Sequence, residues 1–342
     1  MASKVVAAQW IRNWLAGRRQ RVCINQTISS WTPVTSGVPH GSVLGPLLFL
    51  IYINDLDNGI VSKISKFADD TKLCHSSRHP DEVLELQKDL NRLVDWANIW
   101  LMNFNIGHNN IQQQHIGHNN IQHNYTMANQ QLIITEVQRN LGITITRDHK
   151  WQKQNEKSCK TANRIQGFIA RNFNYKSTEL MIPLYKSIVR PHLEYVVPFW
   201  SPHLRWNIDK MERVQRKPAK MIRGIRNLVY QQWLKDLELI SPVQRRLREK
   251  VIEVFKYLNR FNNVCPIGLF NYDFNDRTRN NGKKWIVKRF NTSVAQHFFP
   301  INITTTCNGP PYDVVNSGTV NKFKNSLDAR WEGNPPDVQV NW

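Results

Sequence analysis

The sequence lacks the features of a zinc-stabilised, secreted or membrane-spanning protein. Its five cysteines are scattered and show no C-x-x-C spacing, which argues against structural zinc and fits a reducing compartment. The longest apolar run, Val43 to Ile53, is interrupted by Pro46 and has about half the length that a bilayer crossing needs. No secretory signal peptide opens the chain. We therefore expect no membrane association and an intracellular protein, with the nucleus and the cytoplasm both open.

Acidic residues are scarce relative to basic ones. The chain of 342 residues has 26 Asp plus Glu against 46 Lys plus Arg, a formal net charge of +20. This balance favours a polyanionic partner, and nucleic acid is the first candidate. A basic protein that is merely soluble is the alternative. The length is sufficient for two domains, each with its own core.

The spacing of apolar residues predicts an α+β protein with a mixed first half and a helical second half. The first half is expected to hold a strand over Val22–Ile28, a helix over Asp81–Leu101, and two short strands, Leu132–Thr135 and Leu141–Thr146, joined by a polar turn. The second is expected to hold helices over Thr161–Phe173, Thr178–Val189 with a stop at Pro191, Ile208–Ile225 with a kink or break at Pro218, and Val243–Leu258. Residues 259–311 are predicted to be loop, and a short helix is expected over Val320–Trp331.

Two adjacent carboxylates, Asp69 and Asp70, are the first candidate site. Strand-like residues flank them on both sides, which predicts a hairpin with the pair at its tip. Such a tip can present carboxylate oxygens to Mg²⁺, which prefers oxygen ligands. Isolated Asp-Asp pairs are also common on solvated turns, and two carboxylates are normally too few to hold two ions.

A small-residue loop precedes an apolar helix upstream of this pair. Gly37, Gly41 and Ser42 carry no bulky side chains, so a nucleotide or template base could approach the backbone closely. The alternative is a Gly/Pro turn that only starts a buried helix. In both interpretations the apolar residues at helical spacing are expected to be core: Leu44, Leu47, Leu48, Ile51 and Tyr52.

A basic helix face is the second candidate site. Cations recur at spacings of three and four residues, at Lys210, Arg213, Arg216 or Lys217, Lys220 and Arg223. Only Asp209 and Glu212 are interleaved with them, so the face could contact phosphates or could simply be solvated. The aromatic residues nearby could stack on bases or be buried in the core: Tyr195, Trp200, Trp206, Tyr230 and Trp233.

Two correctly ordered blocks resemble the reverse transcriptases of non-LTR (LINE) retrotransposons, most closely the chicken-repeat-one and jockey-like group. The first runs from Ser36 through the Gly-Val-Pro-His-Gly segment to Phe49 and continues over Tyr52–Leu56, and the second is Phe67-Ala68-Asp69-Asp70, similar to the F/Y-A-D-D motif. Residues 184–195 with Trp200-Ser201-Pro202, and residues 323–331, resemble later parts of these proteins. The resemblance covers almost the whole chain.

This resemblance implies an RNA-directed DNA polymerase that copies an RNA template from a DNA primer with two Mg²⁺ ions. It places a partial palm at residues 1–150, a helical thumb-like region at 151–258 and a C-terminal extension at 259–342. Asp69 would be a catalytic metal ligand and Asp70 its supporting carboxylate. The residues expected to bind nucleotide or template are Gly37, Pro39, His40, Gly41, Ser42 and Phe67.

Three departures from the family pattern concern activity. Trp10–Arg21 resembles sequence beyond the family's first catalytic aspartate, so we expect an N-terminally truncated copy. His40 replaces a glutamine, and a duplication of Ile106–Gln112 as Ile116–Gln122 replaces a segment with a lysine that assists pyrophosphate release. The isolated chain is therefore expected to be inactive. The alternatives are a noncatalytic nucleic-acid-binding remnant and the product of a non-functional pseudogene.

Overall fold

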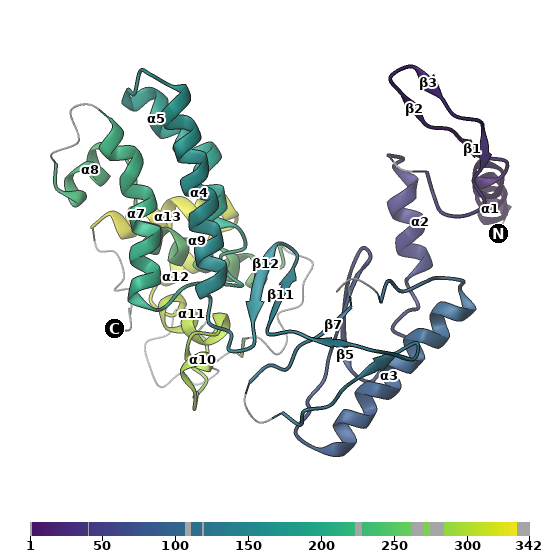
Figure 1. The fold of residues 1–342 in the computed structure, drawn as a ribbon. Helices are drawn as coiled ribbons and strands as arrows, with labels where there is room; N and C mark the ends of the chain where they lie inside the picture. Colours follow the sequence, from purple (N-terminus) through teal and green to yellow (C-terminus); the bar gives the residue numbers. More distant parts are fainter. Residues whose placement is uncertain are drawn as a thin grey trace. The chain divides into compact units, whose positions relative to one another are not determined.

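The structure is a computed structural model, shown in Figure 1. It describes residues 2–39, 41–106, 111–117, 120–222, 228–261, 270–271, 273 and 284–333. The chain divides into two compact units, residues 1–134 and residues 135–342. Helices and strands occur together, as the α+β class requires. The further division into palm, thumb and extension stays a prediction.

The first unit begins with helix α1 (Ala2–Leu15) and two small ladders. Strand β1 (Arg19–Gln20) pairs with β4 (Thr32–Pro33), and β2 (Cys23–Ile24) pairs with β3 (Thr27–Ile28), both antiparallel. The single strand predicted over Val22–Ile28 is therefore wrong. Asn25 and Gln26 have φ angles of 47° and 67°, and two successive left-handed residues close a tight hairpin.

Helix α2 (Leu44–Tyr52) forms where the apolar run predicts it, but it is not a core helix. Leu47 is 52% exposed and Ile51 is 64% exposed, whereas Leu44, Leu48 and Tyr52 are half-buried. The expectation that all five are core is wrong in the described structure. Spacing shows which residues share a face but not whether a partner covers that face.

The core of the first unit is built on α3 (Pro80–Ile99). The helix starts as predicted, with Pro80 in its first turn and the Glu82 carboxylate accepting from the backbone N–H of His79 at 3.0 Å, which satisfies an otherwise unpaired donor. Around it lie β5 (Lys63–Phe67) with β6 (Asp70–Cys74), β7 (Gln112–Gln113) parallel to β10 (Ile133–Ile134), and β8 (Thr126–Met127) with β9 (Gln130–Gln131). The buried apolar cluster is Leu56, Val83, Leu90, Leu93, Tyr125, Met127 and Leu132.

The second unit opens with the hairpin of β11 (Val137–Asn140) and β12 (Ile143–Thr146). The predicted strand over Leu132–Thr135 does not pair with the strand at Leu141–Thr146, since Ile133 and Ile134 pair with β7 instead. Gly142 has a φ of 84° and Leu141 a φ of 44°, which sets the tight turn of the new hairpin.

Helices form the rest of the described second unit. In chain order they are α4 (Gln152–Asn172), α5 (Thr178–Leu184), a π-helix (Tyr185–Val189), α6 (Pro191–Glu194), α7 (Arg205–Met221), α8 (Tyr230–Asp236), α9 (Pro242–Leu258), α10 (Ser293–Gln296), α11 (Phe299–Cys307), α12 (Tyr312–Val315) and α13 (Val320–Gly333). Pro191 does not stop its helical segment but begins α6, which is a permitted first-turn position. Residues 259–311 are not all loop, because α10 and α11 lie within them.

Helix α7 continues through Pro218 to Met221, so the alternative that Pro218 breaks the helix is wrong. A proline inside a helix leaves the carbonyl four residues earlier without its N–H donor. That carbonyl belongs to Val214, and the buried side-chain amide of Gln166 in α4 donates to it at 2.7 Å. A neighbouring helix therefore supplies the missing hydrogen bond, and α4 and α7 lie side by side (Figure 1).

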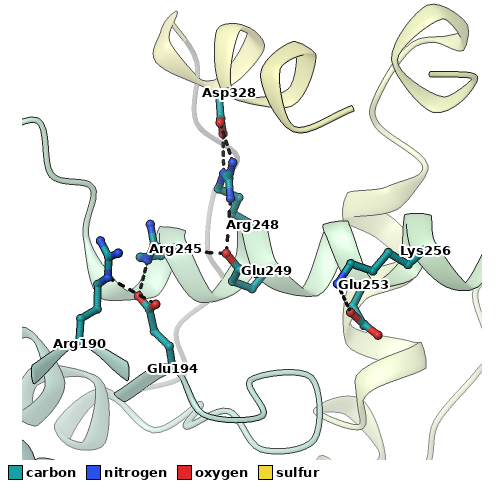
Figure 2. Close-up of polar contacts among 8 residues, drawn as sticks. All are labelled: Arg190, Glu194, Arg245, Arg248, Glu249, Glu253, Lys256 and Asp328. Atoms are coloured by element: carbon teal, nitrogen blue, oxygen red, sulfur yellow. Dashed lines mark hydrogen bonds and ion pairs between the residues drawn. The ribbon is translucent and has the colours of Figure 1, made fainter. Parts of the chain in front are cut away.

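Ion pairs on α9 connect it to α6 and α13, as Figure 2 shows. Arg245 and Arg190 both contact the carboxylate of Glu194. Arg248 binds Asp328 in bidentate fashion, at 2.5 and 2.7 Å. A bidentate, partly buried ion pair of this kind fixes the relative orientation of two helices more firmly than a single exposed ion pair does. None of the described helices is long and apolar enough to cross a membrane.

Candidate functional site

The predicted hairpin around Asp69 and Asp70 is present. Strands β5 and β6 pair from Lys63 with Cys74 to Phe67 with Asp70, so Ala68 and Asp69 form a two-residue turn. Ala68 has a φ of 50°, a left-handed conformation that tight hairpins require. Both carboxylates are exposed, and Phe67 beside them is 64% exposed. The tip therefore offers its oxygens and an aromatic ring to solvent.

Lys66 fixes this hairpin to the C-terminal end of α2. Its ammonium group donates to the carbonyl oxygens of Ile53 and Asn54 at 3.2 and 3.1 Å and to the Asp57 carboxylate at 2.6 Å. The bond from Lys66 lowers the pKa of Asp57 below its usual value. A cation at the carbonyl end of a helix is favourably placed for the helix dipole. One lysine thus sets the position of the turn that carries the two aspartates.

Asp89 holds the other end of the hairpin. This fully buried carboxylate of α3 accepts from the backbone N–H groups of Val61 and Ser62, at 3.1 and 2.7 Å, just before β5 begins. Burial opposes its charge, but hydrogen bonds from the side chain of Ser62, from these two backbone N–H groups and from Arg92 keep the pKa of Asp89 below its usual value. Sequence reasoning missed both anchors. The signal for Asp89 was its spacing of three from Leu86 and four from Leu93, on the apolar face of the helix.

The carboxylates at the tip are too few for a two-ion site. Among the described residues, no group of three or more His, Cys, Asp or Glu side chains is placed to hold a metal ion. Two hard cations need more oxygen donors than Asp69 and Asp70 supply. The resemblance to reverse transcriptases implies two Mg²⁺ ions, but the carboxylates of the described residues do not fit them.

The small-residue loop lies at the opposite, N-terminal end of α2. Gly37 and Gly41 have φ angles of 73° and 79°, and a Cβ on either would meet no atom within 4 Å. Ser42 starts the helix, because its hydroxyl donates to the carbonyl of Pro39 at 2.8 Å and accepts from the N–H of Gly45 at 3.0 Å. The open space beside the glycines is compatible with a close-approaching ligand.

No hydrogen bond or ion pair between described residues joins this loop to the hairpin tip. Pro39 is half-buried. His40 lies outside the described residues.

The predicted basic face of α7 is present, with one member neutralised. Arg213, Arg216, Lys217 and Lys220 are exposed. Lys210 is instead paired with Glu156 of α4 at 3.0 Å. Arg223 lies outside the described residues. The face therefore carries a row of four cations.

The nearby acid, Glu212, is buried, although it still attracts Arg216 of this row. It is 8% exposed and accepts a hydrogen bond from the Tyr230 hydroxyl. Burial raises the pKa of Glu212. No ion pair joins any of the four exposed cations to a carboxylate in the described part of the chain. Cations without a counterion are free to contact phosphates.

The aromatic residues near α7 divide between core and surface. Trp200 and Trp233 are buried, at 0% and 6% exposure, so they are core residues. Tyr195 and Trp206 are 50% and 38% exposed, and the Lys210 ammonium lies 4.4 Å from the Trp206 ring centroid. Arg216 lies 4.2 Å from the ring centroid of Tyr230. Only the exposed rings remain available to a base.

Comparison with known proteins agrees with the motifs. A family model described as "Reverse transcriptase (RNA-dependent DNA polymerase)" matches residues 2–112. The chain is 27% identical over 254 residues to the probable RNA-directed DNA polymerase from transposon X-element of Drosophila melanogaster, covering 68% of this chain and 26% of that relative. It is 26% identical over 261 residues to the RNA-directed DNA polymerase from mobile element jockey of Drosophila funebris, covering 72% and 28%. No solved structure matches the chain.

The family match includes both the small-residue loop and the Asp69-Asp70 hairpin, because both lie inside residues 2–112. The alignments with the relatives are longer than this segment, so the likeness extends beyond it. The chain spans about a quarter of the length of these curated relatives. The comparisons thus confirm that this chain is related to the reverse transcriptases of jockey-like LINE retrotransposons.

Proposed function

We propose that this chain is a reverse transcriptase segment that binds nucleic acid and does not copy it when isolated. The ancestral activity is RNA-directed DNA synthesis, with an RNA template and a DNA primer as partners. The relatives of this chain are named for that activity. The segment proposed here keeps the hairpin with Asp69 and Asp70 and the basic face of α7.

The single observation that carries the binding proposal is the unpaired row of cations on α7. Arg213 and Lys220 are seven residues apart, so they lie on one face of the helix about 10 Å apart along its axis. Arg216 and Lys217 lie between them and are exposed as well. One strand of a duplex carries a phosphate about every 3.4 Å along the axis, so a row of this length spans about three phosphates. The row is therefore suited to a nucleic-acid backbone without base specificity.

The proposed lack of synthesis rests on the donor set. Polymerisation by two metal ions requires carboxylates that hold both ions against the reacting phosphate. Asp69 in the turn and Asp70 at the start of β6 are two exposed carboxylates, and no third acidic, cysteine or histidine ligand joins them among the described residues. We derive no catalytic step through a metal for the isolated chain.

The test combines binding and synthesis on one substrate. The purified chain is mixed with a DNA primer annealed to an RNA template, first without nucleotides and then with all four nucleotides and Mg²⁺. The proposal expects retention of the primer–template on a filter and no extension of the primer. Primer extension that is abolished by Asp69→Asn would overturn the noncatalytic part, and absence of retention at low salt would overturn the binding part.

A further inference from the structure

A small cavity in the second unit is lined by basic side chains from several elements. Its volume is about 60 Å³. It lies between α9, the segment after Trp200, and the residues around α11. The lining residues are Ser201, Pro202, His203, Ile208, Met211, Val243, Arg246, Leu247, Lys250, His297 and Asn302. Four of these are basic, and none is an aspartate or glutamate.

Two of the basic groups are buried cations. Arg246 is 4% exposed and Lys250 is 7% exposed, and both project from α9. The rings of His203 and His297 are half-buried and stack with centroids 3.9 Å apart. Lysine and arginine are almost never this deeply buried without a partner of opposite charge. The cavity therefore concentrates positive charge in an apolar surrounding.

The other cations of α9 show what this cluster lacks. Arg245, Arg248 and Lys256 each contact a carboxylate, in the network of Figure 2. Glu194 is the carboxylate that attracts Arg246 most strongly. Its ion pairs, however, are with Arg190 and Arg245 and not with Arg246. Among the described residues, no ion pair includes Arg246 or Lys250. The same helix thus pairs its outward cations and leaves its inward ones without a counterion.

Several donors of the cluster are unused within the described residues. The buried Nε of Arg246 and Nδ1 of His203 have no hydrogen-bond partner. The Lys250 ammonium makes one hydrogen bond, to the Asn302 side-chain oxygen at 3.2 Å. The Nη1 and Nη2 atoms of Arg246 each donate one hydrogen bond, to the carbonyls of Leu193 and Trp200 respectively. Buried donors without acceptors are rare in folded proteins and mark a ligand or ordered water.

Burial lowers the pKa of these basic groups, as expected for a cluster that contains no counterion. It lowers the pKa of Lys250 to about 7, with a further contribution from Arg246, and it lowers that of Arg246 to about 9 against the opposing attraction of Glu194. Burial lowers the pKa of His203 to about 4, and His297, Lys150 and Lys250 add to this effect. A bound anion would offset the charge that disfavours protonation.

We propose that this cavity binds one phosphate group through Lys250, Arg246 and His203. Its volume has room for about four water molecules, which is the size of a tetrahedral oxyanion and too small for a nucleoside. Donors arrive from α9 and from the segment after Trp200, so they can reach different oxygens of one phosphate. The group could be inorganic phosphate or the terminal phosphate of a nucleotide. This inference does not depend on the proposed function.

The full chain provides the test, by calorimetric titration with inorganic phosphate at constant ionic strength set by chloride. Lys250→Met removes the charge and keeps the stem of the side chain, so it is expected to fold. We expect it to weaken phosphate binding by roughly ten- to a hundredfold, the factor for one charge-assisted hydrogen bond. Lys256→Met is the matched control, because it removes a lysine of the same helix that is already paired with Glu253, and its affinity is expected to be unchanged.

His203→Gln is a second variant, in case Lys250→Met fails to fold, and it is expected to weaken binding as well. No binding of phosphate by the wild-type chain, or equal binding by wild type and both cavity variants, would overturn the proposal. Competition by a dinucleotide with a 5′-phosphate, but not by its 5′-hydroxyl counterpart, would identify a nucleotide as the source. Failure of both to compete would leave inorganic phosphate as the ligand. Neither result depends on primer–template binding.

Discussion

Charge reversal of the α7 row, as Arg213→Glu with Lys220→Glu, is expected to weaken nucleic-acid binding and to flatten its salt dependence. Each phosphate contact on duplex contributes a slope of about −0.9 in log K against log salt, so loss of two contacts should reduce the slope by about 1.8. At about 0.15 M salt the same relation gives about 1 kcal/mol per contact, which is roughly a thirtyfold weaker affinity for the double variant. Fluorescence anisotropy of a labelled primer–template, titrated at several salt concentrations, measures both quantities.

The control for this experiment carries the same change in net charge elsewhere. Lys322 and Arg330 are exposed on α13, and Lys322→Glu with Arg330→Glu lowers the net charge by the same amount. If the α7 row makes the contacts, the control keeps a slope close to that of the wild type. Equal slopes and equal affinities for the two double variants would refute the reasoning, because binding would then depend on total charge alone.

Three further outcomes test the fold. Gln166→Leu leaves the Val214 carbonyl without a donor and is expected to lower the free energy of unfolding, measured by urea denaturation, by about 1–3 kcal/mol. In a Pro218→Ala background, which restores the backbone donor, the loss caused by Gln166→Leu should be smaller. An equal loss in both backgrounds would contradict this account. Asp89→Ala removes the acceptor for two backbone N–H groups and should lower the free energy of unfolding by about 2–3 kcal/mol. Because the pKa of Asp89 is lowered in the folded state, the stability it contributes should be present above about pH 4 and lost as the pH falls through its folded-state pKa. A free energy of unfolding that does not change with pH in this acidic range would contradict the prediction. Burial lowers the pKa of Lys250 from 10.5 to about 7, so the folded protein binds fewer protons between these values and its stability should rise with pH there, an increase that Lys250→Met should remove.

Long amphipathic helices were predictable from the sequence. The expected ranges Asp81–Leu101 and Val243–Leu258 agree with α3 and α9 to within two residues at each end. Their apolar residues recur at spacings of three and four over four or more helical turns, a pattern that distinguishes an amphipathic helix from a strand. The hairpin of Asp69 and Asp70 was also predictable, since strand-like residues flank a two-residue turn.

Contacts between distant residues were not predictable in the same way. The exposure of α2 depends on what packs against it, and the pairing of β11 with β12 depends on a turn at Leu141 and Gly142. The continuity of α7 depends on Gln166, which lies 48 residues before Val214. Local spacing contains no information about such partners.

The basic cavity had a sequence signal that was not used. Arg246 and Lys250 fall at spacings of three and four from Val243 and Val254, inside the apolar face of their helix. A Lys or Arg on an apolar face has two possible arrangements. In the first, its aliphatic stem lies along the apolar surface and its charged end reaches solvent; in the second, the charged end is buried with a ligand. The burial of Arg246 and Lys250, at 4% and 7% exposure, excludes the first arrangement, and this burial depends on tertiary packing.

The most direct test of the central claim is photocrosslinking of a primer–template to the chain, with photoreactive groups on the phosphate backbone and peptide mapping of the labelled sites. The account predicts labelled peptides from residues 205–222, which contain the α7 row, and a loss of that label in the double-reversal variant. Labelling confined to other parts of the chain, with no label in residues 205–222, would contradict it.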